Sequence, residues 1–121
     1  MKIQRLFNDS KGESHFGEMD LEFTPVEFAP PAPPIDLSEF RDAKRVAIMQ
    51  ARPGWKGDWH PAPGRQLMFY LAGHIEGEAS DGTRRTLGPG SVVLVEDTEG
   101  KGHRSRVVGE EDVVIAVVQL E

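Results

Sequence analysis

The sequence contains no cysteine among its 121 residues. This absence excludes a disulfide framework, a thiolate zinc site and a cysteine nucleophile. Any metal ion that the protein binds must therefore be held by His, Asp, Glu or Gln side chains or by water.

Positive charge is also scarce. The chain has 14 Lys and Arg against 20 Asp and Glu, which gives a net charge of −6. Because nucleic acids and anionic membranes bind basic surfaces, neither is expected as a partner, and a neutral or cationic small molecule fits better. No apolar run approaches the length of a membrane span, and residues 1–7 lack the apolar core of a signal peptide. We therefore expect a cytoplasmic protein.

Glycine and proline are plentiful, with 13 and 9 residues, and they separate short segments rich in Val, Ile and Leu. This pattern is typical of an all-β protein with many tight turns. No helix long enough for a crossover connection is indicated, so an antiparallel jelly roll or barrel is predicted as one domain. From residue 45 onward the expected strands are Arg45–Ala51, Asp58–Ala62, Arg65–Ala72, His74–Ala79, Arg84–Leu87, Ser91–Val95, His103–Val108 and Val113–Leu120.

Residues 1–44 form a separate section of the same domain. Strands are expected at Ile3–Phe7 and Met19–Phe23, and a single helical turn at Asp36–Lys44. Between the second of these strands and the helical turn, residues 29–34 contain four prolines, which favour an extended polyproline conformation. We interpret this segment as a rigid strap laid over the body of the protein; a ligand for an SH3-type domain is the alternative.

The strand from Arg65 to Ala72 is apolar on both faces. If Gln66 points into the barrel, then Met68, Tyr70 and Ala72 share its face, and Leu67, Phe69 and Leu71 point outward. Residues 113–118 are likewise apolar on both faces, whereas a half-solvated strand should alternate. Either the N-terminal section or a second subunit must cover this outer surface, and we expect a homodimer.

One motif carries chemistry. Gly54 is followed after five residues by His60, Pro61 and Ala62, after three more by Gln66, and after six more by Gly73. This spacing resembles the first signature of the cupin family, in which His-any-His and Glu occupy the slots filled here by His60, Ala62 and Gln66. The resemblance implies a cupin jelly roll, or double-stranded β-helix barrel. With the single domain that the chain length indicates, we expect one cupin domain over residues 1–121, with residues 45–121 as the barrel body.

A looser match to the second cupin signature follows. Gly90 precedes a five-residue strand, a turn and His103, although Glu96 and Thr98 replace the Pro and Gly of the signature and His103 arrives two residues late. In cupins the histidines and the glutamate of the two signatures bind one divalent metal. The resemblance therefore implies a metal site of His60, Gln66 and His103, without a contribution from Ala62.

The sequence leaves open which metal is bound and whether a metal is bound at all. Two imidazoles and an amide oxygen could hold Fe, Mn, Ni or Zn, and a carboxylate would have to come from Glu96 or Asp97. Alternatively His60 and His103 are pocket histidines without a metal, and they act in acid–base chemistry with Tyr70 as a possible partner acid. No organic cofactor is indicated.

Other residues considered for the site have simpler interpretations. Trp55 and Trp59 either form an apolar wall of the pocket or pack at the barrel rim. His74 is expected beyond the pocket, and His15 on the surface. If His103 faces inward, then Ser105 does too, and the arginines on either side of it face solvent.

Two functions remain. The first is a small-molecule-binding cupin that is a metal-assisted enzyme of the dioxygenase or isomerase type, or a metal-free acid–base enzyme, with His60, Tyr70 and His103 as catalytic candidates. The second is a non-catalytic cupin that binds a metabolite or serves as a structural dimer, with an eroded metal site.

Overall fold

The computed structural model describes all 121 residues and consists of twelve β-strands without a helix. It therefore contains no helix of the length and apolarity that a membrane crossing requires. The strands are β1 Lys2–Asn8, β2 Ser14–Asp20, β3 Phe23–Val26, β4 Ile35–Ser38, β5 Arg45–Ala51, β6 Lys56–His60, β7 Gln66–Ala72, β8 His74–Ala79, β9 Arg84–Leu87, β10 Val92–Glu96, β11 His103–Val108 and β12 Val113–Gln119. Four of the eight strands predicted after residue 44 have the observed bounds, and the others differ by one or two residues at one or both ends.

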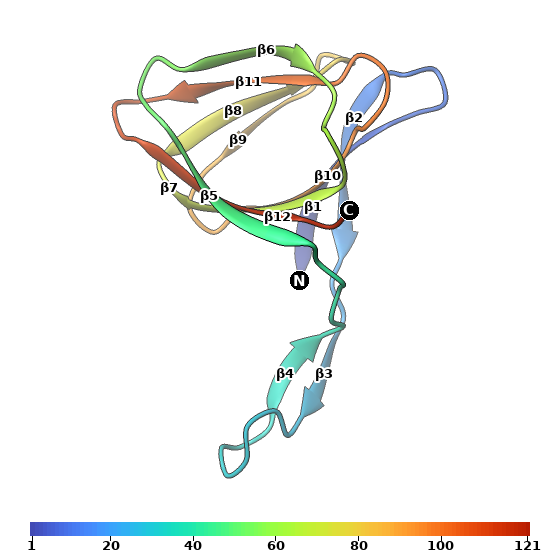
Figure 1. Ribbon diagram of the computed structural model, residues 1–121, viewed down its shortest axis with the longest axis vertical. Helices are drawn as coiled ribbons and strands as arrows, with labels where there is room; N and C mark the ends of the chain where they lie inside the picture. Colours follow the sequence, from blue (N-terminus) through green and yellow to red (C-terminus); the bar gives the residue numbers. More distant parts are fainter.

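Two sheets face each other and form the barrel (Figure 1). The larger sheet has the order β2-β1-β10-β7-β12-β5, and the smaller has the order β6-β11-β8-β9. All neighbouring strands are antiparallel except β1 and β10, which are parallel. The predicted all-β double-stranded barrel is thus confirmed.

The core lies between the two sheets. Alternate residues of β10, β12 and β7 point inward, which is the period-two pattern of a strand. The buried apolar cluster comprises Leu6, Ala62, Tyr70, Ile75, Ala79, Leu87, Val93, Val95, Val107, Val113, Ile115 and Val117. The inward direction of Met68 and Tyr70 agrees with the parity predicted from Gln66.

The N-terminal strands extend the larger sheet at one edge. β1 joins β10, and β2 lies outside it. The hydroxyl of Ser14, which is fully buried, donates a 2.7 Å hydrogen bond to the carbonyl of Gly102, and its backbone N–H donates to the hydroxyl of Ser80 at 2.7 Å. Ser14 therefore ties β2 to the loops of the smaller sheet.

A two-stranded hairpin projects from the barrel (Figure 1). It contains β3 and β4, and we call residues 22–42 the arm. The strands of the arm pair only with each other. The proline-rich segment is the turn of this hairpin, where the N–H of Ala32 donates to the carbonyl of Ala29.

The arm corrects three predictions for the N-terminal section. The proline-rich segment lies at the far end of the hairpin rather than over the body. Residues 36–38 belong to β4, so no helical turn forms there. The strand expected at Met19–Phe23 is replaced by β2, which ends at Asp20, and by β3, which starts at Phe23.

The outer surface of the larger sheet remains apolar and uncovered. We call Val46, Ile48, Leu67, Phe69, Leu71, Val114, Ala116 and Val118 the apolar outer face. The cross-strand pairs Val46–Val118, Ile48–Ala116 and Ala116–Phe69 place residues of β5, β12 and β7 side by side. Val46, Ile48 and Leu71 are 67%, 65% and 53% exposed. The arm of the same chain, which points away from the barrel, does not cover them (Figure 1).

Candidate functional site

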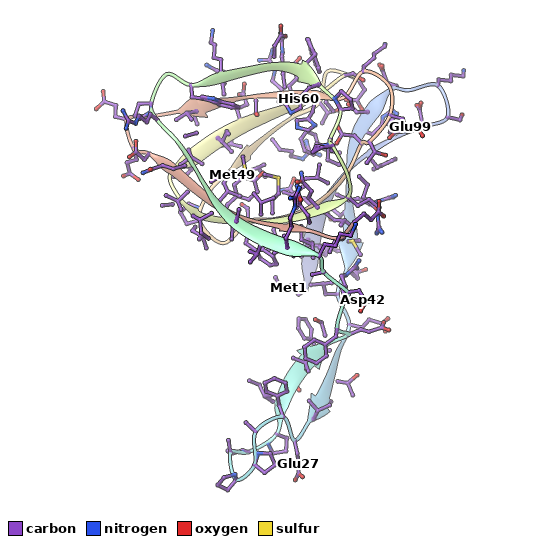
Figure 2. The ribbon with its side chains drawn as sticks, in the orientation of Figure 1. Met1, Glu27, Asp42, Met49, His60 and Glu99 are labelled. Carbon is purple, nitrogen blue, oxygen red and sulfur yellow. The ribbon has the colours of Figure 1, made fainter.

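A cavity of about 350 Å³ lies between the two sheets. Figure 2 draws the side chains on the ribbon and labels Met49 of β5 and His60 of β6, which both line this cavity. Its walls are mainly apolar, and they include Leu6, Phe16, Met49, Trp55, Met68, Tyr70, Ile75, Leu87, Val93, Val95, Val113 and Ile115. A mainly apolar concavity with a few polar groups is the usual form of a small-molecule site.

His60 and His103 lie together in the wall of this cavity. His60 ends β6 and His103 begins β11, and the two residues are cross-strand partners. Their ring centroids are 4.7 Å apart. The structure thus brings together the two histidines that the sequence placed 43 positions apart.

Both imidazoles are held by hydrogen bonds at Nδ1. In His60 this atom lies 2.8 Å from the carbonyl oxygen of Asp58, and in His103 it lies 2.6 Å from Oδ2 of Asp97. Because carbonyl and carboxylate oxygens accept hydrogen bonds, Nδ1 must be the donor and carries the proton in each ring. Nε2 has no hydrogen-bond partner within the protein in either ring. In the neutral form, each ring therefore offers the lone pair of Nε2.

Asp97 fixes the orientation of the His103 ring through Nδ1. Its side chain is fully buried, and Oδ1 has no hydrogen-bond partner in the protein. The backbone carbonyl of Asp97 accepts a 3.0 Å hydrogen bond from the N–H of Ala62, which fixes the loop after β10 to the loop after β6. Asp97 therefore orients an imidazole rather than lining the cavity.

Gly102 allows the two histidines to approach each other. It has φ +73°, and a Cβ at this position would lie 2.0 Å from the carbonyl oxygen of His60. Only glycine combines a left-handed conformation with such a close backbone approach. The signature comparison gave Gly102 no role, although a glycine directly before the second histidine was the available signal.

The donor set falls short of a typical cupin metal centre. Ala62 is buried and has no donor atom, and Oε1 of Gln66 already accepts a 3.1 Å hydrogen bond from Gln119. No three His, Asp or Glu side chains are grouped so that they could hold a metal ion. These residues do not fit a tightly held resident cation. Coordination by His60, Gln66 and His103 stays a prediction.

The two carboxylates considered as extra ligands have different positions. Glu96 accepts hydrogen bonds from Arg5 at 2.5 Å and from Arg65 at 2.8 Å. These hydrogen bonds lower the pKa of its carboxyl group against the opposing effect of burial, which is the largest single influence. Glu96 does not line the cavity, and Asp97 reaches only Nδ1 of His103.

Tyr70 lies deep in the cavity wall. Burial raises the pKa of its phenol well above the usual value. Its hydroxyl has only the sulfur of Met68 as a partner, at 3.9 Å. Tyr70 is therefore a neutral hydroxyl with a weak protein partner, and it is free to bond a ligand.

The alternatives for the neighbouring residues are now resolved. Trp55 lines the cavity, whereas Trp59 lies outside it beneath the guanidinium of Arg104, 4.7 Å from the ring centroid. Ser105 lines the cavity, as its parity predicted. His74 lies outside the cavity, and so does His15, which instead binds Asp9 and Asp81. Phe16 and Met49 are cavity residues that the sequence analysis missed.

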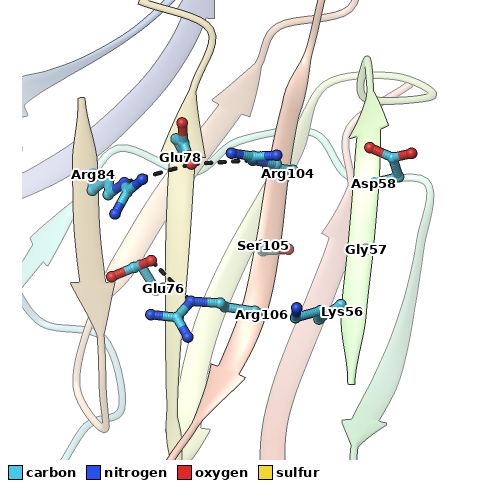
Figure 3. A pocket seen from close by; sticks show the side chains of 9 residues that line it. All are labelled: Lys56, Gly57, Asp58, Glu76, Glu78, Arg84, Arg104, Ser105 and Arg106. Carbon is cyan, nitrogen blue, oxygen red and sulfur yellow. Dashed lines mark hydrogen bonds and ion pairs between the residues drawn. The ribbon is translucent and has the colours of Figure 1, made fainter. Parts of the chain in front are cut away.

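A second hollow, of about 520 Å³, lies on the outer surface of the smaller sheet (Figure 3). No hydrophobic side chain lines it. Five of its charged side chains pair with one another: Glu78 pairs with Arg84 and Arg104, and Glu76 pairs with Arg106. We therefore place the candidate site in the apolar cavity.

Several solved structures resemble this fold. A predicted oxalate decarboxylase from Thermotoga maritima matches with a TM-score of 0.52 at 17% identity, over 84% of this chain and 95% of that one. A cupin-2 domain containing protein from Shewanella frigidimarina matches with a TM-score of 0.51 at 15% identity, over 85% of each chain. The chain has the cupin fold. The family resemblance drawn from the two signatures is thereby confirmed at the level of the fold.

Another cupin-like protein from Thermotoga maritima has a TM-score of 0.52 and 23% identity, over 61% of this chain and 54% of that one. The matched part of this chain thus spans about half of that protein's length. No protein-family model matches the sequence, and no curated protein is detectably similar to it. The activity of this chain must therefore be argued from its own residues.

Proposed function

We propose that this cupin binds a small organic molecule in the cavity between its two sheets. The observation that carries the proposal is the pair of imidazoles at the cavity wall, each fixed through Nδ1 and each with Nε2 unpaired. The apolar walls would hold the body of the ligand, and the two Nε2 atoms would accept hydrogen bonds from its polar group. A ligand with a hydroxyl group matches these acceptors.

Acid–base catalysis is the second candidate. It is favoured by Asp97, which holds His103 in the orientation of a general base whose proton-accepting atom is Nε2. Tyr70, as a neutral buried phenol, would supply a donor within the same cavity. His103, His60 and Tyr70 would then move a proton between two atoms of the ligand, as an isomerase requires. No step of this proposal uses a metal.

Ligand binding is tested with a panel of phenols, small acids and sugars by thermal shift and calorimetry. A ligand at 100 times its Kd stabilises the folded state by about 2.7 kcal/mol. We expect His60→Gln and His103→Gln to lose most of the shift, while the exposed control His74→Gln keeps it. No shift with any compound, or a shift that survives both substitutions, contradicts the proposed site.

The metal alternative and the catalytic candidate need separate measurements. Elemental analysis of protein purified without added metal, with and without His103→Gln, tests coordination at His60, Gln66 and His103. Hydrogen–deuterium exchange into a bound ligand, followed by NMR, tests proton transfer. Binding that persists in Asp97→Asn while exchange stops would support the general-base role, and exchange unchanged by this substitution would exclude it.

A further inference from the structure

The arm carries exposed apolar side chains, and its strands have no partner elsewhere in their own chain. Four of its large hydrophobic side chains are exposed: Phe23 at 44%, Phe28 at 59%, Ile35 at 56% and Phe40 at 75%. The rings of Phe28 and Phe40 lie 6.3 Å apart, so they form one patch. An isolated two-stranded hairpin is at best marginally stable in water, and it needs a packing surface.

The arm is anchored where it leaves the barrel. At its start, the N–H of Leu21 donates to the carbonyl of Met1 at 2.8 Å, and at its end, the N–H of Lys44 donates to the carbonyl of Gln119 at 2.8 Å. These bonds attach both ends of the arm to the larger sheet. They direct the hairpin away from the barrel of its own chain (Figure 1). The packing surface must therefore come from another molecule.

The chain itself presents a surface of the required kind. The apolar outer face spans three neighbouring strands, β5, β12 and β7, and includes the exposed Val46, Ile48 and Leu71. An apolar sheet face of this extent is typical of an interaction site. A single chain thus carries one uncovered apolar projection and one uncovered apolar face.

Charge favours contact between an arm and a barrel over contact between two arms. The arm has five acidic residues, Glu22, Glu27, Asp36, Glu39 and Asp42, and one basic residue, Arg41. Its net charge is therefore −4, and the remaining 100 residues carry only −2 of the total of −6. Two arms packed together would bring their like charges into contact.

We propose that the arm of one chain packs on the apolar outer face of a second copy, and that the second arm returns the contact. The exchange is reciprocal, so it closes into a two-fold dimer in which no arm or face is left uncovered. Phe28 and Phe40 supply the apolar contacts on the arm, and Ile48 and Leu71 supply them on the sheet. The dimer does not depend on the ligand proposed for the cavity.

The mass in solution tests the association. By sedimentation, we expect the wild type to have twice the chain mass of 13.4 kDa. The double variant Phe28→Ser/Phe40→Ser and the single variant Ile48→Lys should both be monomers. Thr86→Lys, which adds the same charge to an exposed position of β9 in the other sheet, should remain a dimer. A monomeric wild type, or a dimer unaffected by the arm and face variants, overturns the proposal.

Cross-linking tests which surfaces meet. Because the chain has no cysteine, single introduced thiols give unambiguous products. A tagged chain with Phe28→Cys is mixed with untagged chains that carry Val46→Cys, Ile48→Cys or Leu71→Cys, and the mixture is oxidised. A disulfide between the tagged and an untagged chain supports arm-on-face packing. Products that join only like chains, or no disulfide for any of the three pairs, contradict it.

Discussion

The inner faces of the two sheets are both apolar, whereas their outer faces differ in polarity. Inside, both contribute apolar residues to a single core, for example Ile115 from the larger sheet and Ile75 from the smaller. Outside, the larger sheet presents the apolar outer face, whereas the smaller presents a ladder of acidic and basic side chains (Figure 3).

This difference separates a solvated surface from one that requires a cover. An antiparallel sheet with one face in water alternates apolar and polar residues, as β11 does with Arg104 and Arg106 between inward-facing positions. β12 does not alternate, because Val114, Ala116 and Val118 are apolar as well. The outer face of the smaller sheet is therefore suited to water and that of the larger sheet to an apolar contact, although both are exposed in the single chain.

The largest expected effect comes from comparing the two faces of the larger sheet. Ile115 is 4% exposed in the core, and Ile48 is 65% exposed on the apolar outer face. Ile115→Ala should lower the free energy of unfolding by about 2–5 kcal/mol, because it leaves a cavity. Ile48→Ala should lower it by no more than about 0.5 kcal/mol in the dilute monomer. Urea denaturation measures both.

Protein concentration sharpens this comparison. If the outer face is covered in a dimer, the cost of Ile48→Ala should rise with protein concentration, whereas that of Ile115→Ala should stay constant. Equal costs for the two substitutions at low concentration would contradict the assignment of one face to the core and the other to a surface.

The next effect concerns the site where the smaller sheet holds its histidines. Gly102→Ala should destabilise the fold by more than the roughly 1–3 kcal/mol that a strained left-handed residue costs, because its Cβ would collide with the carbonyl of His60. Gly82→Ala is the matched control. It has φ +92° and open space around its Cβ position, so it carries the strain without the collision. Urea denaturation should therefore show a larger loss for Gly102→Ala, and equal losses would contradict the close approach.

A smaller effect tests the connection between the two sheets. His15 of β2 has Nε2 2.8 Å from Asp9 and Nδ1 2.8 Å from Asp81, which lies in the turn between β8 and β9. The pKa of His15 is raised mainly by its hydrogen bond to Asp9 and, after that, by its hydrogen bond to Asp81. The stabilisation is thus complete below the ordinary histidine pKa and is lost as pH rises through the raised one.

The measurement is the melting temperature as a function of pH. We expect it to fall as pH rises above about 6.5, the ordinary pKa of histidine. His15→Gln should remove this slope, and His74→Gln, an exposed substitution on β8, should keep it. A slope that persists in His15→Gln would show that the link between the sheets does not titrate through this residue.

Much of the barrel and part of the site could be predicted from the sequence. Short apolar segments between glycines predicted the strands after residue 44. The spacing from Gly54 to Gly73 indicated the cupin fold, and together with the looser second signature it placed His60 and His103 in one pocket. The parity of Gln66 also predicted which side chains point inward. These features depend on local periodicity and on motif spacing, which a single sequence displays directly.

The features that sequence reasoning missed depend on tertiary position. Proline content indicated a rigid segment at residues 29–34, but whether that segment lay on the barrel or projected from it depended on packing that no local pattern records. Asp97 was considered as a ligand, and only its geometry shows that it supports Nδ1 of His103. The role of Gly102 depends on a backbone contact with His60, 42 positions earlier.

The smallest expected effect is on the charged face of the smaller sheet. Glu78 lies between Arg84, at 3.5 Å, and Arg104, at 3.1 Å. Glu78→Gln should lower the free energy of unfolding by only about 0.2–1 kcal/mol, because ion pairs near solvent contribute little. The loss should shrink further in about 0.5 M salt, where the Debye length is only a few ångströms. By contrast, an apolar substitution on the larger sheet should respond little to salt, since its contribution comes from burial. A loss for Glu78→Gln as large as that for Ile115→Ala would mean that the charged ladder contributes to folding as a core does, and that the two outer faces do not differ in kind.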